Sequence, residues 1–193
     1  MQDNELKQVL DTMQIENIIF DIDNVLVDST EWEKTIPADK MSREGWDRHH
    51  KMAFLVKPNI PMAFIIEDLI KKGLKNLFFI TAREDINGMR DVTLRHVYKA
   101  IRRIKDIEKI KIYFYMRNAY DYRTSAQVKE DVLLNHIYPY YFIDVAIDDD
   151  MKNLEMFKNY NIKTFHYTKF SCKDSLTNCY ESCITLNHRT SFV

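Results

Sequence analysis

The sequence predicts an α/β fold in which a five-stranded parallel sheet is covered by helices on both faces. Three observations support this prediction. Five short apolar runs have the length and composition of strands, and the longer segments between them repeat apolar residues with a helical period. Hydrophobic residues make up 46% of the 193 positions, which is enough for one domain with a core. Apolar strands that alternate with helices are typical of parallel sheets buried on both faces.

The individual elements follow from these runs and from the residues that bound them. Asn59, with Pro61 in the first helical turn, marks a helix start, Gly73 marks its end, and Pro139 stops a later helix. Strands are expected at residues 17–21 (NIIFD), 76–81 (NLFFIT), 111–116 (KIYFYM), 141–148 (YFIDVAID) and 162–166. Helices are expected at residues 4–13, 59–73, 89–106, 125–138 and 151–160.

A mixed, polar segment after the first strand predicts a small insert over residues 28–58. It contains both tryptophans of the chain, and one helix is expected within it, over residues 42–55. We expect a single domain over residues 1–167, with the insert serving as a small cap that leaves the site open. Residues 168–193 form a tail rich in Ser, Thr and Cys, with no clear period and no assigned role.

The composition excludes several functional classes. The 28 Lys and Arg residues nearly cancel the 29 Asp and Glu residues, so no broadly basic surface is available to coat a nucleic acid. Only three glycines occur, too few in any stretch for a P-loop, so no kinase activity is expected of this chain. No apolar run reaches the roughly 18 residues that span a bilayer, and the first residues lack an apolar signal core. We therefore expect no membrane partner.

The three cysteines are confined to the tail, at Cys172, Cys179 and Cys183. Together with His188 they have the spacing C-x6-C-x3-C-x4-H, which fits no usual zinc finger, so plain thiols are favoured over a zinc site. An odd number of cysteines in a tail is not a disulfide framework. A cytoplasmic location is expected, which would be the host cytoplasm if the protein is viral.

Acidic side chains follow two of the predicted strands. Asp21 and Asp23 come at the end of the first strand, and Asp148 and Asp149 at the end of the fourth. Because ligands of open parallel sheets bind beyond the carboxyl ends of the strands, we expect these four carboxylates to lie close together. Crowded carboxylates attract a divalent cation, and oxygen ligands that share a site with a phosphate suit Mg²⁺. The alternative interpretation is a pair of solvated acidic loops.

Thr81 and Lys129 are the candidates for binding a phosphoryl group. Thr81 offers a hydroxyl and a backbone N–H at the end of the second strand, and Lys129 lies in the first turn of its helix. A cation at a helix amino terminus is unfavourable against the helix dipole unless an anion binds there. Taken alone, each residue has an ordinary explanation, as a strand-ending threonine or a solvated lysine, so the prediction depends on the two occurring together.

These residues carry a resemblance to a known family. DIDNV, at residues 21–25, resembles the D-x-D-x-[TV] signature of the haloacid dehalogenase superfamily. Thr81, Lys129 and the Asp148-Asp149 pair supply residues similar to the second, third and fourth motifs of the superfamily, in order. The resemblance implies a Rossmann-like α/β fold of the haloacid dehalogenase type.

A narrower resemblance covers residues 17–166. The segments FITARE, YMRNAYDYRTSAQVKEDVLLNHI and VAIDDDMKNLEMFKNYNI are similar to the 3'-phosphatase domain of bacteriophage polynucleotide kinase/phosphatases. The R-x5-R-x5-K spacing of Arg117, Arg123 and Lys129 belongs to this resemblance. The sequence departs from the family pattern at Ser125, where the family has an acid, and at Asp150, where an Arg commonly follows the Asp pair.

The resemblance implies a role for each candidate residue. Asp21 would be the nucleophile that forms an aspartyl-phosphate, and Asp23 the general acid and base. Arg83 would hold the substrate phosphate or the nucleotide. The implied magnesium ligands are Asp21, Asp23 through its backbone carbonyl, Asp148 and Asp149. The implied phosphoryl-binding residues are Thr81 and Lys129. The implied substrate-binding residues are Arg83, Arg117 and Arg123.

The function that the resemblance implies is a Mg²⁺-dependent phosphatase that removes the 3'-phosphate of a DNA or RNA end during nucleic-acid repair. Two alternatives stand beside it. One is a soluble mononucleotide phosphatase of the same superfamily, and the other is an inactive domain that binds nucleic acid or a protein partner. The short insert favours a polymer end as substrate, and the intact acids, Thr81 and Lys129 favour an active enzyme.

Overall fold

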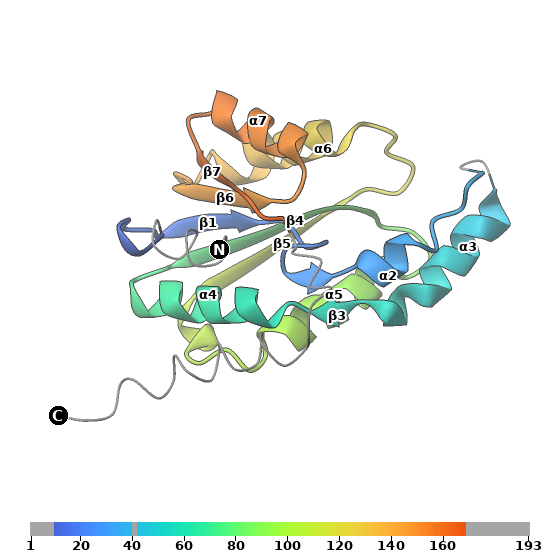
Figure 1. The fold of residues 1–193 in the computed structure, drawn as a ribbon. Coiled ribbons are helices and arrows are strands. Elements are labelled where there is room, and N and C mark those ends of the chain that lie inside the picture. The colour runs from blue at the N-terminus through green and yellow to red at the C-terminus, as the bar shows by residue number, and fades with distance from the viewer. Residues whose placement is uncertain (1–9, 40–41, 169–193) are drawn as a thin grey trace.

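The computed structural model describes residues 10–39 and 42–168, and a five-stranded parallel sheet lies at its centre (Figure 1). The strand order is β5-β4-β1-β6-β7, and every neighbouring pair is parallel. The predicted α/β class is therefore confirmed. The strands are β1 (Asn17–Phe20), β4 (Asn76–Glu84), β5 (Lys111–Arg117), β6 (Val145–Asp148) and β7 (Lys163–His166).

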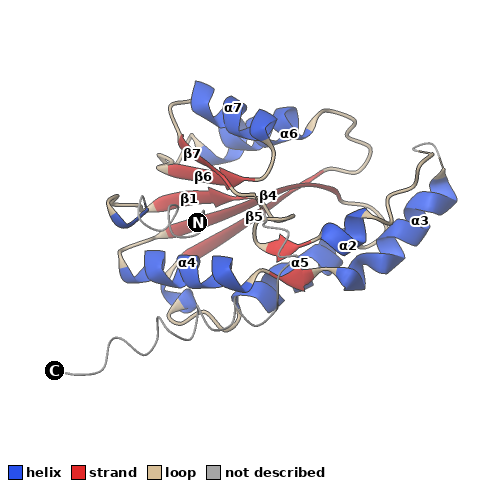
Figure 2. Cartoon of the chain, viewed as in Figure 1, coloured by secondary structure: helices blue, strands red, loops and turns tan. Residues whose placement is uncertain are grey.

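Helices cover both faces of this sheet, as Figures 1 and 2 show. One face carries α6 (Ser125–Val132), which continues as the π-helix η3 (Leu133–Ile137), together with α7 (Met151–Asn159). The other face carries α4 (Ile60–Lys71) and α5 (Met89–Ile101). A short 3₁₀-helix, η2 (Ile107–Lys109), leads into β5.

The central strand β1 contributes to two separate hydrophobic clusters. Ile18 and Phe20 belong to the cluster that includes apolar residues of α4 and α5, and Ile19 belongs to the cluster that includes those of α6 and α7. All three side chains are fully buried. Because successive side chains of a strand point to opposite faces, a strand covered on both sides needs a continuous apolar run, and the IIF that follows Asn17 meets this requirement.

The order of connections places a crevice beside β1. From β1 the chain proceeds to β4 and β5 on one side of the sheet, then crosses to β6 and β7 on the other. Ligands of open parallel sheets bind beyond the carboxyl ends of the strands where the order reverses in this way. Asp21 directly follows β1, and Asp148 is the last residue of the neighbouring β6. The Asp21 and Asp148 side chains therefore lie next to each other at the carboxyl ends of two neighbouring strands.

The insert predicted over residues 28–58 lies at this carboxyl end of the sheet (Figure 1). A two-stranded antiparallel sheet closes its base, which the sequence did not predict because strands of two residues carry no periodicity. The predicted helix over 42–55 is an α-helix followed by one turn of 3₁₀-helix, and the Ser42 hydroxyl caps its start. The elements are β2 (Val27–Asp28), α2 (Thr30–Glu33), α3 (Arg43–Lys51), η1 (Met52–Leu55) and β3 (Lys57–Pro58).

Three predicted boundaries differ from the structure by three residues or more. The second strand runs on past Thr81 to Glu84, because β4 resumes pairing with β5 after a register shift. The predicted helix over 89–106 ends at Ile101, and Asp106 has a left-handed backbone with φ 62°. The fourth strand starts at Val145 rather than at residue 141. Polar residues such as Arg83 and Glu84 extend β4, so the apolar pattern alone did not mark its end.

Two predicted segments fall largely outside the described residues. Of the helix expected over 4–13, only the end is described, where Leu10 and Asp11 are helical and Leu10 is buried. The predicted tail with its three cysteines lies outside them as well, apart from Thr168. Within 10–39 and 42–168, no helix has the length and apolar character needed to cross a membrane.

Asp144 anchors the amino end of β1, which yields a stability prediction. Its Oδ2 accepts the backbone N–H groups of Glu16 (2.9 Å) and Asn17 (3.0 Å). Asp144→Ala would leave both partly buried donors without this acceptor, so the free energy of unfolding should fall by about 2 kcal/mol. Asp144→Asn keeps one acceptor oxygen and should lose about half as much. Urea denaturation measures both values, and a loss for Asp144→Asn as large as that for Asp144→Ala would contradict the role of the retained oxygen as an acceptor.

Candidate active site

The end of β1 fixes the position of Asp21. The backbone N–H of Asp21 donates to the carbonyl of Ile147 at 2.9 Å, which continues the pairing with β6 beyond the strand itself. The side chain is 8% exposed. Burial raises the pKa of the Asp21 carboxyl well above its usual value, although the Lys129 ammonium opposes this shift and the Asp148 carboxylate adds to it.

The Lys129 ammonium lies between two of the predicted acids. Its Nζ donates to Asp21 Oδ1 at 2.5 Å and to Asp148 Oδ2 at 2.6 Å. The lysine side chain is 1% exposed. Burial lowers the pKa of Lys129, but the two carboxylates outweigh this effect and raise it overall, so the ammonium stays charged. Helix α6 thus delivers a buried cation to the carboxyl ends of β1 and β6.

Asp148 is held on its other side by helix α7. Its Oδ1 accepts the backbone N–H of Asp150 (3.0 Å) and the side-chain amide of Asn153 (2.9 Å). Asp150 itself caps α7, because its Oδ1 accepts the backbone N–H of Lys152 at 2.9 Å. This capping role gives a structural reason for an Asp at position 150.

Asp149 is the acid with the fewest partners at this site. Its Oδ2 accepts a hydrogen bond from the Asn24 amide at 3.2 Å, and it forms no ion pair with any of residues 10–39 and 42–168. Burial raises the pKa of Asp149 to about 6; the Asn24 hydrogen bond opposes this shift, and the Asp148 charge adds to it. The site therefore holds more carboxylates than cations.

The acidic cluster fits a divalent cation. Asp21, Asp148 and Asp149 each offer a carboxylate oxygen, and the three oxygens lie within 4.8 Å of one another. An octahedral Mg²⁺ site spans roughly 4 Å between opposite oxygens, so small side-chain movements would bring these atoms onto one ion. Asn153 Oδ1 is also buried, and it has no hydrogen-bond partner among the described residues. These are the hard oxygen donors that Mg²⁺ prefers.

Asp23 is paired with Arg83, the first of the predicted substrate-binding residues. The Arg83 Nε donates to Asp23 Oδ2 at 2.8 Å and its Nη2 to Oδ1 at 2.5 Å, a bidentate pair. Burial raises the pKa of Asp23, but the guanidinium outweighs it, and the pKa is lowered overall. The Arg83 Nη1 contacts the Thr93 hydroxyl (3.2 Å) and His96 Nδ1 (3.0 Å) on α5. Burial, with Arg83 beside it, lowers the pKa of His96 to about 4, so the ring is a neutral acceptor.

The insert contacts the same guanidinium. The Arg83 guanidinium carbon lies 4.5 Å from the centre of the Trp32 ring, a cation–π contact. On the insert, Trp32 stacks on His49 with ring centres 4.4 Å apart, and its Nε1 donates to the His49 carbonyl at 2.8 Å. Trp46 meets His49 edge-on at 5.5 Å. The two tryptophans therefore form the insert's own small core.

A cavity of about 370 Å³ opens at this end of the sheet. Thr81 lies on its wall, where its hydroxyl accepts the backbone N–H of Arg83 at 3.1 Å. The insert supplies the opposite part of the lining. The residues that line the cavity include Asp21, Asp23, Thr81, Arg83, Ser125, Asp149 and Asn153 from the sheet and its helices, and Trp32, Glu33, Ile36 and His49 from the insert.

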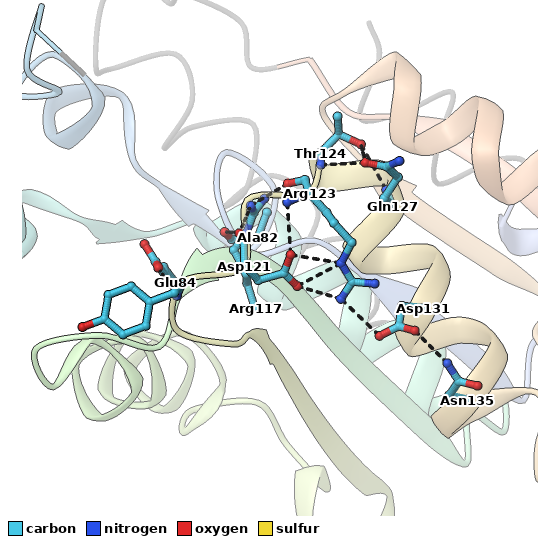
Figure 3. Close-up of polar contacts among 10 residues, drawn as sticks. Ala82, Glu84, Arg117, Asp121, Arg123, Thr124, Gln127, Asp131 and Asn135 are labelled. Carbon is cyan, nitrogen blue, oxygen red and sulfur yellow. Dashed lines mark hydrogen bonds and ion pairs between the residues drawn. The ribbon is translucent and has the colours of Figure 1, made fainter. Parts of the chain in front are cut away.

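Arg117 and Arg123, the other two residues that the resemblance implies to bind substrate, do not line this cavity. Arg117 donates to the backbone carbonyls of Ala82 (2.8 Å), Asp121 (2.8 Å) and Arg123 (2.7 Å), as Figure 3 shows. The Arg123 guanidinium pairs with Asp121 at 2.7 Å and Asp131 at 3.4 Å. Both arginines line a separate cavity of about 200 Å³. Backbone carbonyls and carboxylates of the protein already accept hydrogen bonds from these two guanidinium groups.

Sequence reasoning missed a polar network around Asn24. The Asn24 amide donates to Glu33 Oε1 at 2.7 Å as well as to Asp149, and the Ser29 hydroxyl bridges Asn24 and Glu33. Asn24 has a left-handed backbone with φ 55°, which asparagine adopts more readily than most residues. Its place inside DIDNV was the available signal, because an Asn after two acids is suited to a tight turn.

The fold and this site define a phosphatase of the haloacid dehalogenase type. Residues 16–169 match the family described as the polynucleotide kinase PNKP phosphatase domain, and the chain belongs to this family. The comparison with curated proteins found no match.

Two solved structures show the same fold, and a third is less similar. A chain of the Pnkp1/Rnl/Hen1 complex aligns with a TM-score of 0.56 at 21% identity, covering 82% of this chain and 48% of that one. A chain of the Pnkp1/Rnl/Hen1 RNA repair complex aligns with a TM-score of 0.55 at 20% identity, covering 79% and 42%. A hydrolase from Streptococcus pneumoniae TIGR4 gives 0.48 at 10% identity, covering 89% and 100%. The protein thus spans less than half the length of the first two chains.

The position of Arg117 predicts a structural effect that Arg123 does not share. Arg117→Ala would leave three backbone carbonyls without their charged donor, so the free energy of unfolding should fall by about 2–3 kcal/mol. Arg123→Ala should change it little, because the pairs that Arg123 forms are exposed. Urea denaturation of the two variants gives the comparison, and a larger loss for Arg123→Ala would contradict the assignment.

Proposed function

We propose that the protein is a Mg²⁺-dependent phosphatase that removes the 3'-phosphate from DNA or RNA ends. The observation that carries the proposal is the arrangement of Asp21, which ends β1 inside a cavity, beside a buried lysine and two further acids. Membership of the phosphatase-domain family supports phosphate chemistry. A polynucleotide substrate is supported by the family's description and by the RNA repair complex among the similar structures.

In the first step, a carboxylate oxygen of Asp21 attacks the phosphorus and the bond from phosphorus to the 3'-oxygen breaks. The leaving oxygen takes a proton from Asp23, and an aspartyl-phosphate remains on Asp21. Arg83 holds Asp23 in its charged form when no substrate is bound. A phosphate dianion beside Asp23 would raise the pKa of this carboxyl by repulsion, and it would offer Arg83 a second anionic partner.

In the second step, water attacks the phosphorus of the aspartyl-phosphate, and Asp23 accepts the proton that the water loses. Inorganic phosphate leaves and the Asp21 carboxylate is restored. Lys129 uses two of its three N–H donors for Asp21 and Asp148, so one remains for a phosphoryl oxygen, and Thr81 offers its hydroxyl on the cavity wall. Mg²⁺ held by Asp21, Asp148, Asp149 and the Asp23 carbonyl would neutralise charge on the phosphoryl group.

Asp21→Asn should abolish turnover while the protein remains folded. The amide keeps the shape of the side chain but cannot form the covalent intermediate, and it removes one charge from a crowded acidic cluster. We expect p-nitrophenyl phosphate hydrolysis to fall by at least about a thousandfold, with an unchanged circular dichroism spectrum. Asp11→Asn, a surface change, is the matched control and should retain full activity. Activity of the Asp21 variant within tenfold of the wild type would remove Asp21 from the mechanism.

Removal of divalent cations should inactivate the protein reversibly. EDTA should stop hydrolysis and added Mg²⁺ should restore it, because the cluster holds more negative than positive charge. A readout independent of activity is the melting temperature, which Mg²⁺ should raise in the wild type by binding the folded state. Asp148→Asn and Asp149→Asn should each lose most of this rise. Full turnover in chelator would rule out the metal-dependent mechanism.

Substrate choice separates the proposal from its alternatives. With Mg²⁺ present, a 3'-phosphorylated oligonucleotide should be hydrolysed with a higher kcat/KM than the 5'-phosphorylated one, with little dependence on sequence. The net charge of −1 predicts few phosphate contacts, so log kcat/KM should fall with log salt at a slope of about one to three. Faster hydrolysis of 5'-mononucleotides would identify a nucleotidase. Absence of turnover on every substrate, with Mg²⁺ binding intact, would identify an inactive binding domain.

A further inference from the structure

The loop between β5 and α6, residues 118–124, presents two large aromatic side chains to solvent. Tyr122 is 88% exposed and Tyr120 is 69% exposed. Among the described residues, neither phenol ring has a hydrogen bond or an aromatic neighbour. Because aromatic rings stabilise a fold mainly when they are buried, these two contribute little to the stability of the domain.

The loop that carries the tyrosines is firmly held. Arg117 donates to two of its backbone carbonyls, those of Asp121 and Arg123, and also to Ala82 in β4 (Figure 3). The Asp121 carboxylate accepts the backbone N–H of Arg123 at 3.1 Å, and Thr124 closes the loop in a capping box with Gln127. Exposed rings on a rigid base lose little entropy when they bind a partner.

Tyr120 has an unusual backbone conformation. Its φ is 62°, in the left-handed region that bulky residues rarely adopt. The Glu84 carboxylate accepts its backbone N–H at 2.5 Å and so holds this conformation in place. Gly or Asn would adopt this conformation with less strain, so a tyrosine at this position lowers the stability of the loop. Strained residues of this kind gather at functional sites.

The loop borders the cavity that contains Asp21. Ser125, the residue directly after the loop, lines that cavity, as does Ala82, whose carbonyl binds Arg117. Figure 1 shows that the chain leading into α6 and the insert lie at the same end of the sheet, beyond the strands. A strand whose last phosphate reaches Asp21 can therefore leave the cavity over this loop.

We propose that Tyr120 and Tyr122 form a stacking surface for the bases next to the terminal phosphate of a single-stranded DNA or RNA end, an inference that rests on the proposed function. Bases stack on aromatic side chains without regard to sequence, because every base has a flat π face. The Arg123 guanidinium in the same loop is paired with the Asp121 and Asp131 carboxylates, so stacking rather than charge is the main contribution expected of this surface. The surface would thus add affinity for a polymer without reading its bases.

The test compares kcat/KM of the full chain, with Mg²⁺, on three substrates. These are a single-stranded 3'-phosphorylated oligonucleotide, the same oligonucleotide without the two bases nearest the phosphate, and p-nitrophenyl phosphate. Tyr122→Ala should lower kcat/KM on the complete oligonucleotide by roughly tenfold, and Tyr122→Phe should keep it. Tyr120→Asn removes the second ring while preserving the left-handed backbone, and should also lower it. On the oligonucleotide without those bases, and on p-nitrophenyl phosphate, the losses should be at most about twofold.

Tyr140→Ala is the matched control. Tyr140 is 76% exposed, but it precedes β6 and so lies toward the amino end of the strands, away from the cavity. The Tyr140→Ala variant should hydrolyse all three substrates with the kcat/KM of the wild type. Unchanged oligonucleotide turnover in both Tyr122→Ala and Tyr120→Asn would overturn the stacking surface alone, provided that the wild type prefers the 3'-phosphorylated oligonucleotide. A wild type that prefers 5'-mononucleotides would overturn the proposed function and this inference with it.

Discussion

The buried Lys129 ammonium is the interaction on which the rest of the site depends. Asp21 and Asp148 end neighbouring strands, so the sheet itself forces two carboxylates together in a place from which water is largely excluded. Two such charges are costly to bury unless a cation lies between them. Lys129 supplies that cation from α6, at 2.5 and 2.6 Å from the two acids. One side chain thereby connects a helix to the two strands that carry the chemistry.

Arg83 performs a similar task for the remaining parts of the domain. Its guanidinium pairs with Asp23 beyond β1, contacts Thr93 and His96 on α5, and lies against Trp32 of the insert. The insert and the proposed general acid therefore contact the same cation. The two buried cations pair with three of the acids. The fourth, Asp149, has no such partner among the described residues, and its pKa is raised to about 6, mainly by burial.

The parts of the site that could be predicted are those that the ends of the strands determine. Asp21 and Asp148 come together because parallel strands end at one edge of the sheet, and apolar runs show where these two strands end. Thr81 lies within β4, three residues before its end, and lines the same cavity. The positions of Arg117 and Arg123 could not be predicted in this way. Their spacing agrees with a substrate clamp, but the carbonyls and carboxylates that engage them are identified only by the path of the loop.

The sequence by itself determined the α/β class and the five strands, and it indicated the four acids and Lys129 as candidates for one site, because hydrophobic period and short motifs are local properties of the chain. Only the tertiary structure decided which cation pairs with which acid, that the insert contributes Trp32 to the cavity, and that two tyrosines stand exposed on a rigid loop. The pairs Lys129–Asp21 and Arg83–Asp23 join residues 108 and 60 positions apart. Such contacts depend on how packed helices and strands place side chains in space, and that information is not present in any local stretch of sequence.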